Sequence, residues 1–197
     1  QKWSDAVSTF DQIINNGWDS LIPDYADLFT VANENHAETV FDVQYSGLEG
    51  GSYGCLVCLE GNAGPGFQGI RQYNGPIYGD GNSYNLPTQN LYDFFPSNDP
   101  RKGYTILDID AFIAAQPNPQ NITYAIGAGG HTGYYNNKYI KRQGEIGAND
   151  NDLTSPVNYR AIRYADVLLM AAEAHFQNGN SSTAEQYLNL VRQRAGV

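Results

Sequence analysis

A glycine-rich stretch with spaced aromatic side chains is the part of this sequence best suited to bind a ligand. Residues 47–81 hold 11 of the 21 glycines, and no helical or strand period runs through them. Sugar rings have apolar C–H faces that stack on aromatic rings, which offer large contact area with few rotors to freeze. Amide and guanidinium groups beside the rings could bond the sugar hydroxyls. The candidate ligand-binding residues are Tyr53, Phe67, Arg71, Tyr73, Tyr78 and, just beyond the stretch, Tyr84.

Two other interpretations of this stretch stay open. The tyrosines could pack the loops onto a helical scaffold, and for any single tyrosine this is the favoured interpretation. The stretch could also be a disordered connection. Its aromatic content argues against disorder, because disordered chains are usually poor in aromatic residues. Its length argues for a function, since loops this long are uncommon in compact domains unless they serve one.

Possible metal and redox ligands are few and scattered. Cys55 and Cys58 form one CxxC, which could be a redox pair, a local disulfide or, the favoured interpretation, two unpaired thiols. A zinc site needs four ligands, and the sequence has no second CxxC. Asp150 and Asp152 could ligate calcium, but the run lacks the glycine and distal glutamate of an EF-hand loop, so a solvated acidic turn is favoured. We expect no metal and no cofactor.

The sequence contains no recognisable catalytic set. It has neither the Gly-x-Ser-x-Gly nucleophile elbow nor the His-Glu-x-x-His zinc motif. A glycosidase needs two carboxylates at a set distance across a cleft. Because 21 acidic residues always permit such a pair, their presence decides nothing. We therefore expect a binding protein rather than an enzyme.

The charge balance limits the class of partner. Eleven lysine and arginine residues against 21 aspartate and glutamate residues give a formal net charge of −10. This disfavours nucleic acid, whose binders need a basic face, and also an anionic membrane surface. A neutral sugar or a peptide is compatible with it. No stretch of the sequence approaches the roughly 20 apolar residues of a membrane span.

Two amphipathic helices joined by a short polar break are expected over residues 158–197. In each, apolar residues recur at spacings of three and four, as on one face of an α-helix. They are Ile162, Ala165, Leu169, Ala172 and Phe176 in the first helix, and Ala184, Tyr187, Leu188, Val191 and Ala195 in the second. Gly179 suits the left-handed residue that ends a helix, and Ser182 with Glu185 matches a capping box that starts the next.

A connection this short makes the two helices antiparallel. Asp166 then lies level with Arg192 and Arg194, so that the first turn of one helix is beside the last turn of the other. Aspartate favours the first place and arginine the second because of the helix dipoles. We expect an Asp166–arginine contact.

Other elements are short. Residues 2–16 read as a helix with one apolar stripe, formed by Trp3, Val7, Phe10 and Ile14. A short helix is expected over residues 88–95, with Thr88 as its cap. Residues 38–45 and 134–140 read as strands.

Three runs near the end of the chain match a known family in order, spacing and residue type. They are Arg163-Tyr164-Ala165-Asp166-Val167-Leu168-Leu169-Met170, then Ala172-Glu173-Ala174, then Leu188-Asn189-x-Val191-Arg192-x-Arg194-Ala195-Gly196. Weaker matches upstream are Pro23-Asp24-Tyr25-Ala26-Asp27-Leu28-Phe29, Glu38-Thr39-Val40-Phe41, Asp99-Pro100-Arg101, and Gly133-Tyr134-Tyr135 with Lys138-Tyr139. The chain thereby resembles the SusD/RagB family, the surface glycan- and nutrient-binding lipoproteins of the Bacteroidetes outer membrane.

The resemblance implies a mainly α fold of tetratricopeptide-like helical pairs, a SusD-like α/α superhelix, with long irregular loops and a few short strands. Residues 1–197 would form a single domain fragment, with a helix over 1–17, a loop-rich region with short strands over 18–157 and a helical hairpin over 158–197. The chain opens inside a helix without Met and stops where the family continues, so we expect an internal fragment. The packing partner of the first helix would then lie before Gln1.

The resemblance further implies non-enzymatic capture of a glycan, oligosaccharide or other nutrient at the outer-membrane surface. The ligand would pass to a TonB-dependent, SusC-like transporter, and the lipid anchor would lie outside this fragment. The family has no fixed ligand motif, so no candidate residue is carried over from it. Two rivals stay open: a tetratricopeptide adaptor that binds a peptide, which predicts several repeats of ~34 residues, and, less favoured, a carbohydrate-active enzyme.

Overall fold

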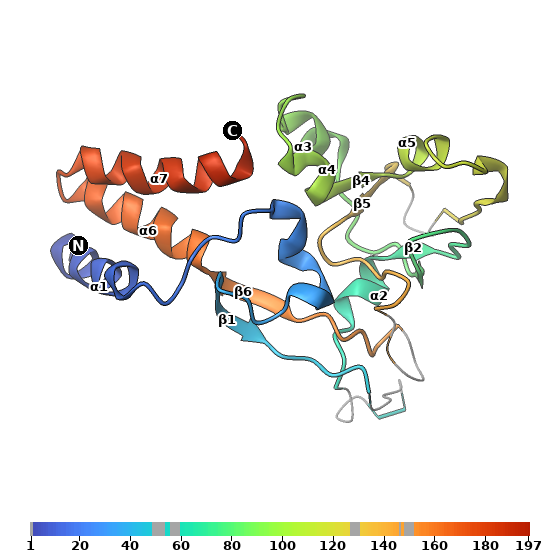
Figure 1. Ribbon diagram of the computed structural model, residues 1–197. Coiled ribbons are helices and arrows are strands. Elements are labelled where there is room, and N and C mark those ends of the chain that lie inside the picture. The colour runs from blue at the N-terminus through green and yellow to red at the C-terminus, as the bar shows by residue number, and fades with distance from the viewer. Residues whose placement is uncertain (1, 49–53, 56–59, 127–130, 146, 148–151) are drawn as a thin grey trace. The chain divides into compact units, whose positions relative to one another are not determined.

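The chain divides into two compact units, the first made of residues 1–43 and 160–197 and the second of residues 44–159. The computed structural model (Figure 1) describes residues 2–48, 54–55, 60–126, 131–145, 147 and 152–197. The expected single domain over residues 1–197 stays a prediction.

Three helices build the first unit around a shared apolar core. α6 (Tyr164–Gln177) packs against both α1 (Trp3–Asn16) and α7 (Ser181–Ala195) (Figure 1). The core consists of Tyr164, Val167 and Leu168, with Phe10, Ile13, Ile14, Leu21, Tyr187 and Val191 partly buried around them. Within this chain the packing partner of α1 is therefore α6, and the expected partner before Gln1 stays a prediction.

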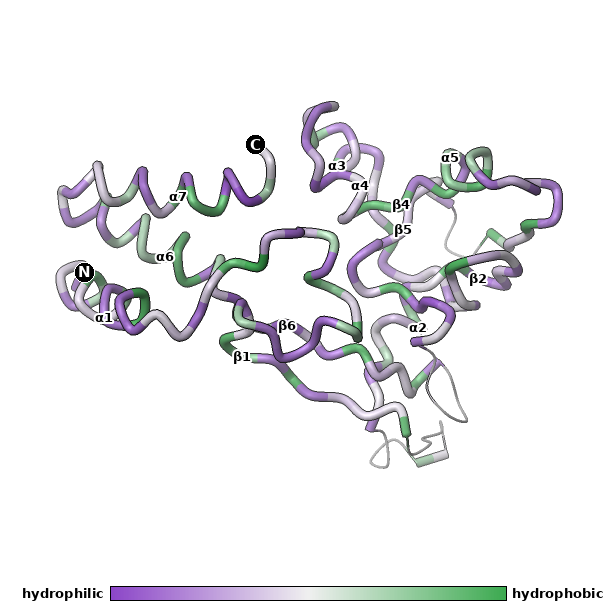
Figure 2. The backbone as a smooth tube through the Cα atoms, in the orientation of Figure 1, coloured by the Kyte–Doolittle hydropathy of each residue, from purple (hydrophilic) through white to green (hydrophobic). Residues whose placement is uncertain are grey.

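The two C-terminal helices are confirmed, but the buried face of the first is not the expected one. Ile162 belongs to strand β6 (Tyr159–Arg163), while Leu169 and Phe176 are 40% and 62% exposed. The buried residues of α6 are Tyr164, Ala165, Val167, Leu168, Ala171, Ala172, Ala174 and His175. A single-stripe prediction fails here because α6 contacts one helix on each of two sides, so that it buries small and polar residues too. On α7, which alternates hydrophobic and hydrophilic residues (Figure 2), the expected face holds except at Leu188, which is 41% exposed.

The connection between α6 and α7 turns at a left-handed glycine. Gly179 has φ +87°, as expected for the residue that ends a helix. The cap of α7, however, is Asn180, whose side chain accepts a hydrogen bond from the Thr183 amide at 3.2 Å. The expected capping box of Ser182 and Glu185 is wrong because α7 already begins at Ser181.

A two-stranded sheet and two 3-10 turns complete the first unit. β1 (Thr39–Val43), inside the expected strand, pairs with β6, and the turns are η1 (Tyr25–Phe29) and η2 (Val31–Asn33).

The expected Asp166–arginine contact forms with an arginine of a different element. The Arg163 amide donates to Asp166 Oδ2 at 2.9 Å and thereby caps α6. Arg194 instead binds the carboxylate of Glu38. The prediction placed Asp166 opposite the end of α7 from hairpin geometry alone, and it missed the buried carboxylate that Arg194 binds.

The second unit is built from short elements joined by long loops. Its helices are α2 (Gly64–Gln68), α3 (Gln89–Phe94), α4 (Arg101–Thr105), α5 (Ile109–Ala114) and the 3-10 turn η4 (Pro119–Asn121). Its strands pair as β2 (Ile70–Arg71) with β3 (Asp80–Gly81), in parallel, and β4 (Ile106–Asp108) with β5 (Tyr134–Asn136), antiparallel. The short helix capped by Thr88 is confirmed, since Thr88 Oγ1 accepts from the Leu91 amide at 3.2 Å.

An apolar core holds the short elements of the second unit together. Its buried members are Ile70, Tyr73, Tyr78, Leu107, Ile109, Tyr135 and Ile140. They come from β2, the loop after it, β4, α5 and β5, so long-range packing rather than local periodicity positions these loops.

Close backbone approach explains part of the glycine content. A Cβ on Gly61 would lie 2.1 Å from Cα of Thr154, and one on Gly66 would lie 2.2 Å from the Asp152 carbonyl oxygen. Real Cβ atoms do not approach that closely, so these two positions need glycine for space. Part of the glycine-rich stretch is therefore packed against residues 152–154 rather than extended into solvent.

The fold class is mainly α with a few short strands and long loops, as expected. Among the helices described, none has both the length and the hydropathy of a membrane-spanning segment.

Candidate functional site

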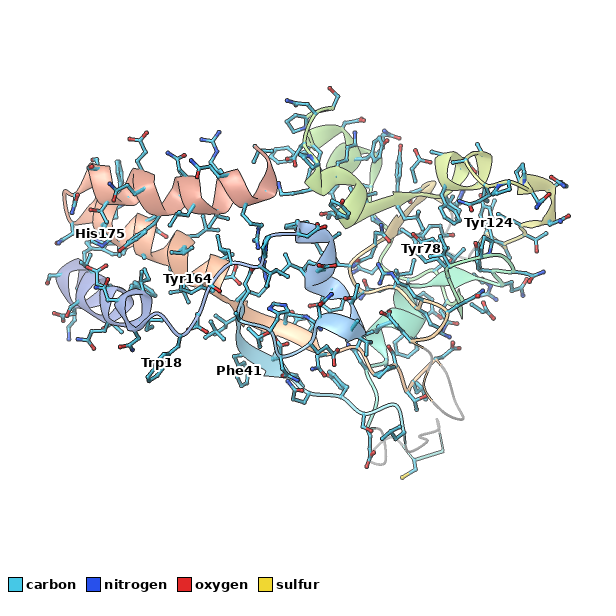
Figure 3. The ribbon with its side chains drawn as sticks, viewed as in Figure 1. Trp18, Phe41, Tyr78, Tyr124, Tyr164 and His175 are labelled. Carbon is cyan, nitrogen blue, oxygen red and sulfur yellow. The ribbon has the colours of Figure 1, made fainter. Side chains whose placement is uncertain are left out.

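Two of the six candidate residues belong to the core of the second unit. Tyr73 and Tyr78 are 7% and 6% exposed, and their rings meet edge to face with centroids 6.1 Å apart. Tyr78 also packs edge to face on Phe112 at 5.1 Å. Burial raises the pKa of both phenols. Rings enclosed in this way offer no free face to a sugar, so the packing interpretation holds for these two tyrosines (Tyr78 is labelled in Figure 3).

Of two further candidates, only Arg71 lies among the described residues. Arg71 is half-buried in β2, where its amide donates to Ser83 Oγ at 3.0 Å and its carbonyl accepts from the Ala125 amide at 2.8 Å. These bonds are backbone contributions to loop packing. Tyr53 lies outside the described residues.

Phe67 and Tyr84 are brought together as an aromatic pair. Their ring centroids are 6.1 Å apart with a tilt of 36°, and the Tyr84 amide donates to the Phe67 carbonyl at 2.8 Å. Phe67 is half-buried at the end of α2, whereas Tyr84 is 59% exposed. Phe67 thus supports a ring that still presents most of its surface to solvent.

The backbone around Tyr84 adopts a conformation that is rare for residues other than glycine. Ser83 has φ +59° and Asn85 has φ +55°, so both neighbours of Tyr84 lie in the left-handed region. Such residues cost free energy and cluster at ligand-binding sites, where the surrounding structure imposes them. This backbone strain is present on both sides of Tyr84, whose ring is the most exposed of the described candidates.

A pocket of about 270 Å³ begins at the residue that follows Tyr84. Apolar and uncharged polar side chains, with one lysine, line it: Asn85, Leu86, Pro87, Thr88, Leu91, Thr105, Ile106, Asn136 and Lys138. An apolar floor with a few polar groups around it is the usual composition of a small-molecule site.

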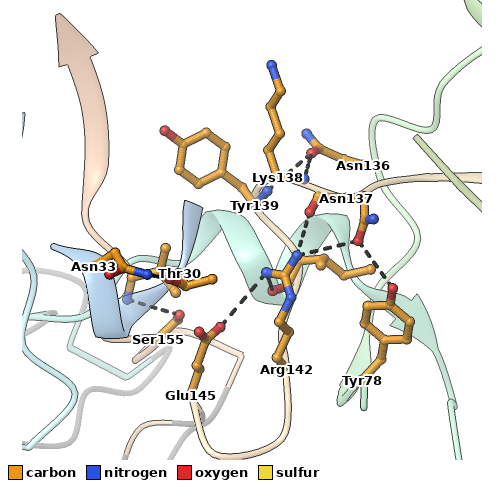
Figure 4. Close-up of polar contacts among 12 residues, drawn as sticks. Thr30, Asn33, Tyr78, Asn136, Asn137, Lys138, Tyr139, Arg142, Glu145 and Ser155 are labelled. Atoms are coloured by element: carbon orange, nitrogen blue, oxygen red, sulfur yellow. Dashed lines mark hydrogen bonds and ion pairs between the residues drawn. The ribbon is translucent and has the colours of Figure 1, made fainter. Parts of the chain in front are cut away.

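The turn from Asn136 to Tyr139 contributes Asn136 and Lys138 to the lining of this pocket and thus forms one wall of it. Asn136 Oδ1 accepts hydrogen bonds from the amides of Lys138 at 2.9 Å and Tyr139 at 3.2 Å (Figure 4). Its Nδ2 donates to Gln68 Oε1 at 2.5 Å, which ties the turn to α2. Tyr139 lies 5.5 Å from the ring of Tyr159, which is 49% exposed. None of these residues was among the six candidate ligand-binding residues.

The comparison that decides the family covers almost the whole chain. The model of the SusD family matches residues 10–197. This chain belongs to the SusD family.

Several relatives of this SusD-family chain share both sequence and fold. Surface glycan-binding protein A from Bacteroides thetaiotaomicron, in complex with laminarihexaose, is 27% identical with a TM-score of 0.89, over 99% of this chain and 43% of its own. A laminarin-binding SusD-like protein is 30% identical with a TM-score of 0.85, over 100% and 44%. SusD-like protein P2 from Formosa agariphila is 31% identical over 182 residues, 89% of this chain and 34% of its own length. The chain thus spans between a third and less than half of these relatives.

A second pocket of the SusD-family chain, of about 360 Å³, is lined by Tyr92 and Lys102 among others. Tyr134 stacks on the Tyr92 ring with centroids 4.3 Å apart and a tilt of 16°. Lys102 Nζ lies 3.6 Å from the same centroid. Because these two groups occupy the faces of the ring, Tyr92 does not present an aromatic platform.

The possible metal and redox ligands of the SusD-family chain are already engaged. Lys141 Nζ binds Asp152 Oδ1 at 2.6 Å, so an ammonium group occupies the place where a cation would neutralise this carboxylate; Asp150 lies outside the described residues. Within the described ranges, no group of three His, Cys, Asp or Glu side chains is arranged to hold a metal ion. Cys55 is disulfide-bonded, so the favoured interpretation of unpaired thiols is wrong for it; Cys58 lies outside the described residues.

Proposed function

We propose that this protein binds a neutral glycan or oligosaccharide at the cell surface without altering it chemically. The observation that carries the proposal is the exposed ring of Tyr84, which is supported by Phe67, lies between two left-handed residues and directly precedes Asn85, a residue that lines a pocket. Tyr84 would stack on the apolar face of a sugar ring. Asn85 and the Asn136–Tyr139 turn would bond its hydroxyls.

The size of the pocket favours a short segment of a glycan, and the net charge of the whole chain favours a neutral one. Its volume of about 270 Å³ is slightly below that of most small-molecule sites, which run from roughly 300 to 1,000 Å³. It would therefore hold a few sugar units of a longer glycan. The net charge of −10 opposes strongly anionic ligands over the chain as a whole. Two relatives are described by laminarihexaose and laminarin, which makes that class of glycan the first to test.

The wider role is proposed from family membership. The protein would be an outer-membrane lipoprotein that captures the glycan non-enzymatically and delivers it to a TonB-dependent, SusC-like transporter. The helical first unit would serve as scaffold, and the loops of the second unit would present the ligand site.

Calorimetric titration of the intact protein with laminarihexaose and a panel of other neutral oligosaccharides tests the proposal. We expect saturable binding of at least one oligosaccharide, which chromatography then recovers at its original length. Absence of binding across the panel would contradict the glycan proposal. Shortened products would instead identify an enzyme.

A further inference from the structure

Asn137 ties the pocket wall of residues 136–139 to the rest of the second unit. Every polar group of Asn137 is hydrogen-bonded. Its amide donates to the Thr105 carbonyl at 3.0 Å and its Nδ2 to the Gly103 carbonyl at 2.8 Å. Its side-chain oxygen accepts from the Tyr78 hydroxyl, and its carbonyl oxygen accepts from Arg142 Nη2. The turn is thereby tied to the end of α4, which contributes Thr105 to the same pocket.

Arg142, five residues after Asn137, binds it through the guanidinium group. Its Nη2 donates to the Asn137 carbonyl at 2.6 Å and lies 3.4 Å from Asn137 Oδ1 (Figure 4). Its Nη1 donates to the Ile140 carbonyl at 3.5 Å and lies 3.9 Å from the Glu145 carboxylate. The planar guanidinium thus bridges both ends of residues 137–140, a task that the point charge of a lysine cannot perform.

Tyr78 holds the same residue from the core. Its hydroxyl donates to Asn137 Oδ1 at 3.2 Å, while its ring is fixed by Tyr73 and Phe112. A phenol so enclosed can move little, so it gives Asn137 a rigid reference point. Tyr78, first considered as a stacking residue, therefore reaches the candidate site through its hydroxyl.

We propose that Arg142 and Tyr78 are positioning residues that pre-organise the Asn136–Tyr139 wall for the glycan. The inference rests on the proposed function of this pocket. Asn137 itself is turned into the protein, whereas its neighbours Asn136 and Lys138 line the pocket. Figure 4 shows the Lys138 and Tyr139 side chains leaving the turn away from Arg142. A wall that is already ordered spares the ligand the conformational entropy of ordering it on binding.

The chain offers a matched control for the Tyr78 hydroxyl. Tyr73 is a buried tyrosine of the same core, and its hydroxyl donates to the Pro76 carbonyl at 2.7 Å rather than to the turn. Tyr78→Phe and Tyr73→Phe each delete one buried hydroxyl and preserve the ring. Both variants should lower thermal stability similarly. Only Tyr78→Phe should weaken the binding of laminarihexaose, by about 2- to 12-fold for the loss of one neutral hydrogen bond. Arg142→Lys should weaken laminarihexaose binding further, because lysine lacks the planar guanidinium that bonds to both Asn137 and Ile140.

A second readout needs no ligand. The amides of Lys138 and Tyr139 bond to Asn136 Oδ1, so their hydrogen exchange reports on the order of the wall. We expect exchange to accelerate in Tyr78→Phe and Arg142→Lys but not in Tyr73→Phe. If amide exchange and laminarihexaose affinity were the same in all three variants, the proposed positioning role of Arg142 and Tyr78 would be overturned, even if Tyr84→Ala abolished binding. If the wild-type protein bound no glycan, the proposed function would fail, and the exchange result would still decide whether Arg142 and Tyr78 order the turn.

Discussion

The guanidinium of Arg194, near the end of the chain, binds the fully buried carboxylate of Glu38, with Nη2 3.1 Å from Oε1. Arg163 Nη1 donates to the same Oε1 at 3.0 Å, and the Ile22 amide donates to Oε2 at 3.0 Å. This carboxylate therefore joins α7, the start of α6 and the loop after α1. Buried and paired with two arginines, it is a structural centre of the first unit.

Removal of this carboxylate should be strongly destabilising. Glu38→Ala would remove the buried carboxylate with which Arg163 and Arg194 pair, and breaking a buried pair costs roughly 3–5 kcal/mol. Urea denaturation of the intact protein measures the free energy of unfolding. Glu185→Gln, an exposed change on α7, is the control and should alter it by under about 0.5 kcal/mol. A Glu38→Ala protein as stable as the control would show that the pair contributes little.

Two adjacent leucines of α6 should differ sharply in their contribution to stability. Leu168 is 1% exposed and Leu169 is 40% exposed. Leu168→Ala should cost about 2–5 kcal/mol, because it leaves a cavity between three helices. Leu169→Ala, its matched control, should cost less than half as much. Chemical denaturation of both variants measures their free energies of unfolding. A larger loss of stability in Leu169→Ala than in Leu168→Ala would show that Leu169, not Leu168, is the core residue.

His36 should make stability pH-dependent in mildly acidic solution. Burial lowers the pKa of His36 below its ordinary value of 6.5, and Arg160 and Arg163 add to this against the opposing charges of Glu38 and Asp42. Below pH 6.5 the unfolded chain binds a proton at this position before the folded protein does. Stability should therefore fall as the pH decreases from 6.5 to the lowered pKa of the folded state.

The substitution His36→Asn tests this assignment. Asparagine can still accept the hydrogen bond that His36 Nδ1 receives from the Glu38 amide at 3.0 Å, but it does not titrate. The slope of unfolding free energy against pH should become flatter than in the wild-type protein within that window. An unchanged slope would assign the pH dependence to other groups.

Local periodicity was enough to predict the three long helices, α1, α6 and α7, but not their environment. The apolar stripe of α1 gave its boundaries within one residue, because Phe10 and Ile14 pack on a single partner helix. On α6 the same reasoning selected Leu169 rather than Leu168, because that helix is covered on two sides. Glu38, Arg163 and Arg194 stood out as parts of family motifs, but nothing local indicates that residues 156 positions apart bind each other.

The candidate site was predicted only in part for a related reason. Tyr73 and Tyr78 lie in the stretch without any period and Tyr84 lies just beyond it, so their sequence neighbourhoods look alike. Packing with β4, α5 and β5 buries the first two and leaves the third exposed. The pocket wall at residues 136–139 comes from a segment about fifty residues later, and its turn depends on contacts that only the fold creates.

The glycan affinity of Tyr84→Ala tests the central claim most directly. Phe94→Ala is the matched control, since Phe94 is an exposed aromatic residue of the same unit, 82% exposed, that does not line the pocket. By analogy with bases stacked on aromatic side chains, loss of the Tyr84 ring should cost about 1–3 kcal/mol of binding free energy for laminarihexaose, or for the best ligand of the panel. Phe94→Ala should bind like the wild-type protein, and both variants should melt at nearly the wild-type temperature. Equal affinity of Tyr84→Ala and the wild-type protein would contradict the account.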